Sequence, residues 1–260
     1  RFRASAITEL AAAVASREVR SATGDAAVRR LEQVRPCADP LLRVVHDRAR
    51  RRDDAGAAAT TILLETGRLR PAPLVARYRD AASGAWRAVA ARAMIAPEDW
   101  LARQTAMVDP DERVRRAALT AAITSPAPDD LEALLAAARV DPDPEARLLA
   151  IHAAGALGGA RAVEALADRW ARADERARRA TVRAWSAPAS YGAGGRERLL
   201  HVVSSSVGLA SIDAAAALAA RGGAEGEAGV AALVRGITSG AAAERRLAIR
   251  LAPVERPEAR

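Results

Sequence analysis

The chain has 260 residues and a net charge of +8, and all 40 of its basic residues are arginine. Half of the residues are hydrophobic but only 3% are aromatic, so the core has to be built mainly from Ala, Leu and Val. The single cysteine, Cys37, excludes an intrachain disulfide and a cysteine zinc cluster. No run of 18 apolar, uncharged residues is present, which argues against a membrane-spanning helix. The spread-out basic excess permits an anionic partner without demanding one.

The hydrophobic pattern has the period of an α-helix along the whole chain, and no segment alternates like a β-strand. Together with the Pro, Gly and Asp breaks, it predicts about sixteen helices, or about eight antiparallel pairs, in an all-α fold. In chain order they lie near residues 4–18, 25–35, 40–51, 53–66, 71–81, 84–95, 97–108, 111–124, 128–139, 144–157, 160–172, 174–186, 195–204, 208–221, 226–238 and 241–251.

Local signals mark where helices begin and end. Asp109 precedes Pro110 and a further pair of acids, which predicts a capping Asp before a Pro at the first helical position, and Asp141 repeats the device. The pairs Gly158-Gly159 and Gly222-Gly223 predict left-handed helix ends. The segment APASYGAGG, residues 187–195, predicts a flexible loop that is a candidate for partner contact.

A motif recurs about every 31 residues, and a fixed period in this range is typical of a solenoid of stacked helical units. The copies read VDPDERVRRAAL (108–119), VDPDPEARLLAI (140–151), RADERARRATV (172–182) and AERRLAI (243–249). We call the recurrent arginine of the repeats the anchor arginine. The anchor arginines are Arg87, Arg115, Arg147, Arg178 and Arg245, and Gly208 stands at the same position in one further copy.

The segment AAGALGGARAVEALADRW (153–170), which follows DPDPEARLLA, resembles the short bacterial HEAT repeats that also occur in phycocyanobilin-lyase-like proteins. The resemblance implies a right-handed α-solenoid. Because the motif is poor before residue 80, we expect degenerate helical repeats over residues 1–81, with a different helical arrangement of this part as the alternative. Residues 82–260 are then expected to form a HEAT-like array that continues from them.

In HEAT repeats, an Asp in the inter-helix turn and an Arg six residues later form a ladder between neighbouring units. The resemblance therefore assigns ladder roles to two pairs, Asp109 with Arg115 and Asp141 with Arg147. The other three anchor arginines, Arg87, Arg178 and Arg245, lack an Asp at this offset. The ladder is expected to be broken at those three positions.

Each repeat is expected to be a pair of helices, which we call its first helix and its second helix in chain order. On each second helix, three positions spaced i, i+3 and i+7 share one side. Seven of the fifteen such positions are arginine, namely Arg113, Arg116, Arg176, Arg179, Arg183, Arg246 and Arg250, and His152 occupies another. The resemblance places second helices on the concave surface, so it implies a basic concave stripe. One interpretation is a solvated helix face in an arginine-rich protein. The other is a partner or anion site, since the guanidinium fork binds phosphates and carboxylates.

The sequence contains no motif of an enzyme, and we expect neither a cofactor nor a metal. There is no nucleophile elbow, phosphate loop or dinucleotide fingerprint, and His46, His152 and His201 lie on separate helices. The four tryptophans are expected in the core, with a stacking platform for nucleic-acid bases as the alternative. They are Trp86, Trp100, Trp170 and Trp185.

We therefore expect a non-catalytic scaffold that binds a protein partner. One alternative is a nucleic-acid-binding protein with a groove like that of the HEAT-like DNA alkylpurine glycosylases, which the chain resembles in general fold alone. Another is a lyase-like or chaperone-like accessory protein. No signal peptide is visible, which favours the cytoplasm over export. The chain starts with Arg1 instead of Met, so we expect it to be a processed form or a piece of a longer protein.

Overall fold

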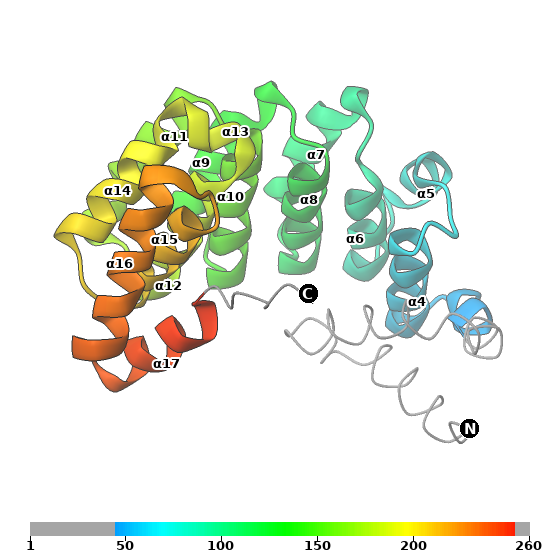
Figure 1. Ribbon diagram of the computed structural model, residues 1–260. Coiled ribbons are helices and arrows are strands. Elements are labelled where there is room, and N and C mark those ends of the chain that lie inside the picture. Colours follow the sequence, from blue (N-terminus) through cyan, green and yellow to red (C-terminus); the bar gives the residue numbers. More distant parts are fainter. Residues whose placement is uncertain (1–44, 253–260) are drawn as a thin grey trace, which may run out of the picture. The chain divides into compact units, whose positions relative to one another are not determined.

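The computed structural model describes residues 45–252, of which 79% are helical and none lies in a strand (Figure 1). The predicted all-α class is therefore confirmed. The helices predicted at 4–18 and 25–35, together with Cys37, lie outside the described residues. The chain divides into two compact units, Arg1–Ala121 and Ala122–Arg260, while the predicted division after residue 81 stays a prediction. Among the described helices, none has a stretch apolar and long enough to cross a bilayer.

The first unit contains α4 (Asp54–Glu65), α5 (Pro71–Tyr78), α6 (Gly84–Ala93), the 3-10 turn η3 (Pro97–Asp99), α7 (Trp100–Met107) and the first part of α8 (Glu112–Thr124). Its core gathers around Trp86, which is buried between α4, α5 and α6. The Trp86 ring stacks on Tyr78 with centroids 4.4 Å apart, and its Nε1 donates to the carbonyl of Arg52 at 3.3 Å.

The second unit is built from two layers of helices. It contains η4 (Pro128–Asp130), α9 (Leu131–Val140), α10 (Pro144–Leu157), α11 (Ala160–Ala167), η5 (Trp170–Arg172), α12 (Glu175–Ser186), α13 (Pro188–Ser190), η6 (Tyr191–Gly195), α14 (Arg196–Ser205), α15 (Leu209–Ala219), α16 (Gly223–Ser239) and α17 (Ala242–Leu251). The second helices of the repeats pack in order, α10 on α12, α12 on α15 and α15 on α17. The first helices α9, α14 and α16 pack against this layer from one side (Figure 1).

Small residues let the second helices approach one another closely, as the alanine-rich composition predicts. Ala150, Ala153 and Ala154 of α10 are completely buried. Gly155 lies so close to α12 that a Cβ atom at this position would overlap the Cα and Cβ of Ala184. The contact between α10 and α12 therefore depends on the absence of a side chain at residue 155.

The caps of α8 and α10 are formed by the second Asp of each turn, so the prediction for Asp109 and Asp141 is wrong. The Asp143 carboxylate accepts from the N–H groups of Glu145 and Ala146 at 3.2 and 3.1 Å, and Asp111 accepts from Arg113 N–H at 2.9 Å. The first Asp instead accepts from the N–H of the second at 2.8 Å in both turns. That bond folds the Asp-Pro-Asp turn and leaves the later carboxylate beside the free N–H groups of the helix.

The segment 187–195, predicted as a flexible loop, contains the short helix α13, which Pro188 starts, and then η6, a kink that joins α13 to α14. Within the kink Ala193 and Gly194 have non-helical backbone angles, so the predicted interruption of the helices is present while Pro188–Ser190 is helical. Gly194 has a φ of 109°, a value that L side chains rarely adopt. The Tyr191 hydroxyl donates to Glu225 of α16 at 2.7 Å, and the Arg221 guanidinium lies 4.2 Å from the Tyr191 ring centroid. These contacts fix the insertion on the following repeat.

Candidate functional site

Each anchor arginine donates to backbone carbonyls of the turn that precedes its own helix. The contacts run from Arg87 to Ala81 and Ala82, Arg115 to Asp109 and Pro110, Arg147 to Asp141 and Pro142, Arg178 to Trp170 and Ala171, and Arg245 to Gly240. Distances lie between 2.6 and 3.5 Å. We call this contact the turn latch, and it gives the recurrent arginine a structural role within its own repeat.

Asp109 joins two neighbouring repeats, because its carboxylate receives both Nε and Nη2 of Arg87 at 2.9 and 3.0 Å. The expected break of the ladder at Arg87 is therefore wrong: this arginine needs no Asp in its own turn when the next turn supplies one. The Arg87 guanidinium lowers the pKa of Asp109, and the bond from Asp111 N–H lowers it further. The ladder roles of Arg115, Asp141 and Arg147 remain predictions.

The arginines predicted to form the stripe, which we call the second-helix arginines, are partly neutralised by acids. In the first unit Arg113 bonds Asp111 of its own helix start at 2.7 Å and Asp54 of α4 at 2.8 Å. In the second unit Arg179 bonds Asp213 of α15 at 2.6 Å, in a pair whose side chains are largely buried. Arg176 approaches Glu145 of α10 at 3.3 Å, and Arg116 lies half-buried on α8.

His152 does not add a positive charge to these arginines. Its Nε2 is buried, and no described residue forms a hydrogen bond with it. Burial lowers the pKa of His152, and the nearby charge of Arg183 lowers it further, with a smaller opposing effect from Glu145. The lowered pKa favours the neutral form of the imidazole over the cation.

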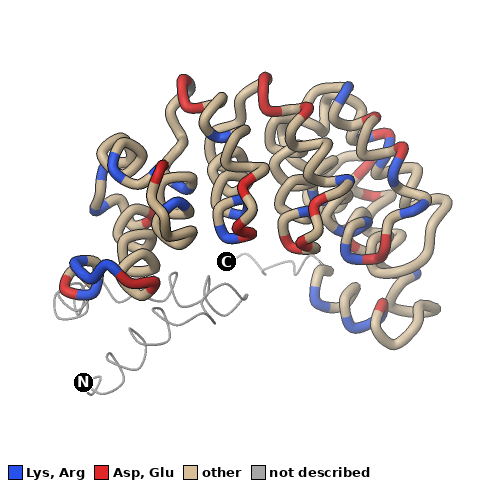
Figure 2. Tube along the Cα trace, turned by 180° about the vertical axis from the view of Figure 1, so that it is seen from behind, with Lys and Arg blue, Asp and Glu red and all other residues tan. Residues whose placement is uncertain are grey.

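Besides Arg176, three of the second-helix arginines are exposed on the second unit, Arg183 on α12 and Arg246 and Arg250 on α17. None of the three forms an ion pair with another residue in the described part of the chain. Acidic and basic residues are interspersed along the described helices, as Figure 2 shows. The second helices therefore present a face of mixed charge with a local excess of arginine.

Sequence reasoning did not predict that an acid at one helix start reaches the start of the neighbouring helix. The Glu175 carboxylate at the start of α12 accepts from the N–H of Ala210 at 2.7 Å and so caps α15. In the first unit the Asp111 carboxylate contacts Gly84, the first residue of α6, where a Cβ would overlap it. The glycine at position 84 is the sequence feature that leaves room for this carboxylate.

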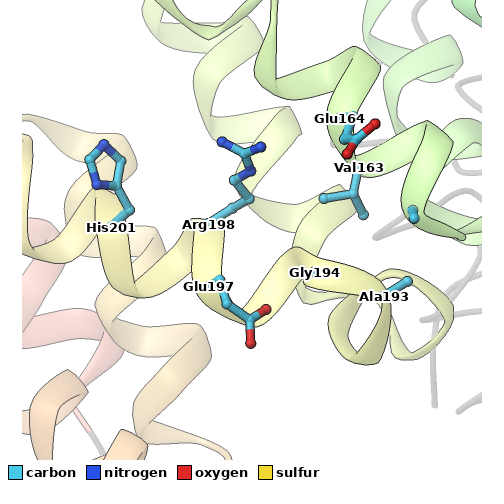
Figure 3. Close-up of a pocket in the computed structure, with 8 residues that line it drawn as sticks. Val163, Glu164, Ala193, Gly194, Glu197, Arg198 and His201 are labelled. Atoms are coloured by element: carbon cyan, nitrogen blue, oxygen red, sulfur yellow. The ribbon is translucent and has the colours of Figure 1, made fainter.

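A shallow cavity of about 360 Å³ lies on the other layer of the second unit, between α11, η6 and α14 (Figure 3). Its apolar part is formed by Ala160, Val163, Ala193 and Gly194. The charged side chains Glu164, Glu197 and Arg198 and the imidazole of His201 are exposed at its rim. In Figure 3 the Glu197 and Arg198 side chains point in opposite directions, so the rim charges do not converge on one ligand position.

The core interpretation holds for two of the four tryptophans, while Trp100 and Trp170 are half-buried. Trp86 and Trp185 are buried, and Trp185 Nε1 donates to the carbonyl of Val163 at 3.3 Å. Trp170 is half-buried and stacks on Trp185, with ring centroids 5.2 Å apart, while the Arg178 guanidinium contacts its ring at 5.8 Å. Within the described residues no group of three or more His, Cys, Asp or Glu side chains is arranged to hold a metal ion.

Comparison with known proteins identifies the repeat. Residues 99–186 match the family model of the HEAT repeats. Among solved structures, the chain is similar to an engineered protein from the Northeast Structural Genomics Consortium, with a TM-score of 0.43 and 20% identity. That similarity covers 87% of this chain and 70% of the engineered protein. No curated protein matches the chain.

Proposed function

We propose that this chain, whose residues 99–186 are HEAT repeats, is a non-catalytic scaffold that binds an acidic segment of a partner protein on its second helices. HEAT repeats generally serve as protein-interaction scaffolds, and stacked repeats offer an extended surface for such a partner. The observation that carries the proposal is the mixed charge of the second-helix face of the second unit.

The mixed charge favours a protein over a nucleic-acid duplex. A duplex presents a regular line of phosphates and is bound by several cations at once. On this face Asp213 and Glu145 lie among the arginines, at 2.6 and 3.3 Å from Arg179 and Arg176. A duplex bound along this face would bring its phosphates close to these carboxylates, which would repel them. A protein segment can match both signs of charge in turn, which gives specificity as well as affinity.

The exposed arginines Arg183, Arg246 and Arg250 are the groups that we expect to contact the partner's acidic side chains. Each guanidinium can form a bidentate pair of hydrogen bonds with one carboxylate. Arg179 in the same unit, and Arg113 in the first unit, already have carboxylate partners and are expected mainly to stabilise the fold.

The test is a fluorescence-anisotropy titration of the full chain with a labelled peptide rich in Asp and Glu and, separately, with duplex DNA. Replacing Arg183, Arg246 and Arg250 together by Glu should weaken peptide binding about tenfold or more. The matched control replaces three exposed arginines of the first helices, Arg161, Arg198 and Arg235, and should change the affinity by less than about twofold.

Two results would contradict the proposal. If both triple variants lose the same affinity, the peptide responds to net charge alone. If DNA binds more tightly than the peptide, with an affinity that falls with salt by a log–log slope of about −0.9 per neutralised phosphate, the chain is a nucleic-acid-binding protein.

A further inference from the structure

The helix α16 has one face packed in the second unit and an opposite face that is open to solvent. On the packed face, a Cβ at Gly229 would overlap the backbone of α15, and a Cβ at Gly236 would overlap a side chain of α15. On the opposite face Val230 and Val234 are 41% and 51% exposed, and Ala231 is exposed between them. The exposed residues of this face, which we call the α16 stripe, follow the spacing i, i+3, i+4, i+7, i+8 and i+11 of one side of a helix. They are Glu227, Val230, Ala231, Val234, Arg235 and Thr238.

The α16 stripe differs from the exposed faces of the preceding first helices, α11 and α14. The exposed residues of α11 are Ala160, Arg161 and Glu164. Those of α14 are all polar, namely Arg196, Glu197, Arg198, His201, Ser204 and Ser205. A single exposed valine is ordinary on a protein surface. Two valines one helical turn apart, with charged residues on either side, suit a surface that another chain covers.

The two charges of the stripe have no partner in their own helix. No residue three or four positions from Glu227 is basic, and none at those distances from Arg235 is acidic. Neither side chain forms an ion pair with another described residue. By contrast, Glu225 of the same helix bonds Arg196 of α14 at 2.7 Å. The stripe therefore carries one acid toward its N-terminal end and one base toward its C-terminal end, and both are available to a partner.

We propose that the α16 stripe binds the same stripe of a second copy of this chain, with the two helices antiparallel. A two-fold axis near residue 232 places Val230 of one copy against Val234 of the other, as an interface between identical surfaces requires. With a rise of 1.5 Å per residue, Glu227 of one copy and Arg235 of the other then lie about 3 Å apart along the helix axis. Two ion pairs flank four valines in this arrangement.

The charges select the antiparallel orientation. In a parallel pair, Glu227 would face Glu227 and Arg235 would face Arg235, and both contacts would be repulsive. The same pattern favours a second copy as the occupant, because the stripe is complementary to itself only when it is reversed.

The size of the stripe predicts a weak dimer. The 17 residues of α16 span about 25 Å, so one helix pair buries less than the roughly 800 Å² per partner of a standard interface. We expect a dissociation constant of roughly 10–100 μM. The dimer uses a first helix, whereas the acidic segment of the proposed function binds second helices, so this inference goes beyond that function.

The first experiment is sedimentation equilibrium of the full chain from about 1 to about 500 μM. The mean mass should rise from 27.2 kDa toward twice that value. Val234→Asp should weaken the dimer about tenfold or more, because it places a carboxylate against Val230 of the other copy. The control Val207→Asp makes the same change at a valine that is 92% exposed in the turn before α15, and should change the dissociation constant by less than about twofold. Both positions are exposed, and thermal unfolding checks that both variants remain folded.

The second experiment exchanges the charges. Glu227→Arg and Arg235→Glu should each weaken the dimer about threefold to tenfold, because each turns two attractive pairs into repulsive ones. The double variant, Glu227→Arg with Arg235→Glu, has the net charge of the wild type and restores both pairs in reverse, so it should dimerise like the wild type.

Three results would overturn the proposal. One is a mass of 27.2 kDa at every concentration. Another is the same dissociation constant for Val234→Asp and Val207→Asp, which would place the contact elsewhere on the chain. The third is a double charge variant that dimerises no better than the single ones. These measurements need no acidic peptide, so they succeed or fail independently of the proposed function.

Discussion

At the scale of single residues, the contact between Arg87 and Asp109 is the best-defined link between two repeats in the first unit. Both side chains are mostly buried, at 22% and 14% exposure, and two parallel hydrogen bonds join them. A buried charge that loses its partner is costly, whereas an exposed ion pair contributes little. The two kinds of pair should therefore respond very differently to removal of the acid.

We predict that Asp109→Ala lowers the free energy of unfolding by roughly 1–3 kcal/mol, because Arg87 loses its partner and the turn loses the bond from Asp111 N–H. The matched control is Asp80→Ala, which removes an 87% exposed carboxylate paired with Arg79 and should have an effect below about 0.5 kcal/mol. Urea denaturation measures both. Equal midpoints for the two variants would show that the buried pair does not stabilise the array.

The same pair predicts a dependence on pH. The pKa of Asp109 is lowered in the folded state, mainly by the hydrogen bonds from Arg87. Its contribution to stability is therefore fully present above the unfolded pKa of about 3.9, and it is lost as pH falls through the lower folded pKa. We expect the stability difference between wild type and Asp109→Asn to shrink between about pH 5 and pH 2. A difference that grows toward acid pH in urea midpoints would contradict this assignment.

At the scale of elements, the sequence predicted helices best where polar caps and hydrophobic period agree. The helix predicted at 144–157 is found at Pro144–Leu157, and Gly158 ends it with a φ of 76°. The sequence did not reveal that Asp143 caps α10 while Asp141 accepts a bond within the turn, because aspartate is a good capping residue at either position. The short helix Pro188–Ser190 within residues 187–195 was not predicted, because a glycine-rich string has no helical period. The contacts of Tyr191 with Glu225 and Arg221, in a later repeat, were not predictable from local sequence either.

The candidate site was less predictable than the fold, because spacing places a side chain on a helix face without showing its partners. The repeat alignment placed Arg113 and Arg179 on that face, but Asp54 and Asp213, which bond them, lie 59 and 34 residues away. Such long-range pairs follow from helix packing, which a single sequence does not reveal.

The kink between α13 and α14 supplies a matched pair of glycine variants. Gly194→Ala should lower the free energy of unfolding by about 1–2 kcal/mol, since its φ of 109° is strained for any residue with a Cβ, although that Cβ would meet only Val163, at 3.6 Å. Gly192→Ala lies in the same element without positive φ and without a close neighbour, and should be neutral or slightly stabilising. Equal melting temperatures for the two variants would show that a Cβ at residue 194 does not lower the stability of the protein.

At the scale of the whole molecule, a repeat array is expected to respond locally to a packing defect. Gly155→Ala forces a Cβ against Ala184 and should destabilise the contact between α10 and α12 by roughly 1–3 kcal/mol. Hydrogen exchange should increase in α10 and α12 and remain unchanged in α16 and α17 of the same unit. The control Gly226→Ala adds a Cβ at ordinary contact distance, 3.5 Å from the carbonyl of Ala219, and should change neither region. A uniform rise in exchange across the second unit would show that it unfolds as one block.

The turn latch has a consequence for how such an array can change in length. Because each anchor arginine bonds carbonyls of its own repeat, a duplicated or deleted repeat would carry its turn latch with it. The copy with Gly208 at the anchor position is the exception, since α15 receives its cap from Glu175 in the preceding repeat. Side-chain pairs between repeats, such as Arg87 with Asp109 and Arg179 with Asp213, would be lost at the new junction unless both partners were inherited. Among the described repeats, the turn is therefore a unit of one repeat, whereas the side-chain pairs are units of two.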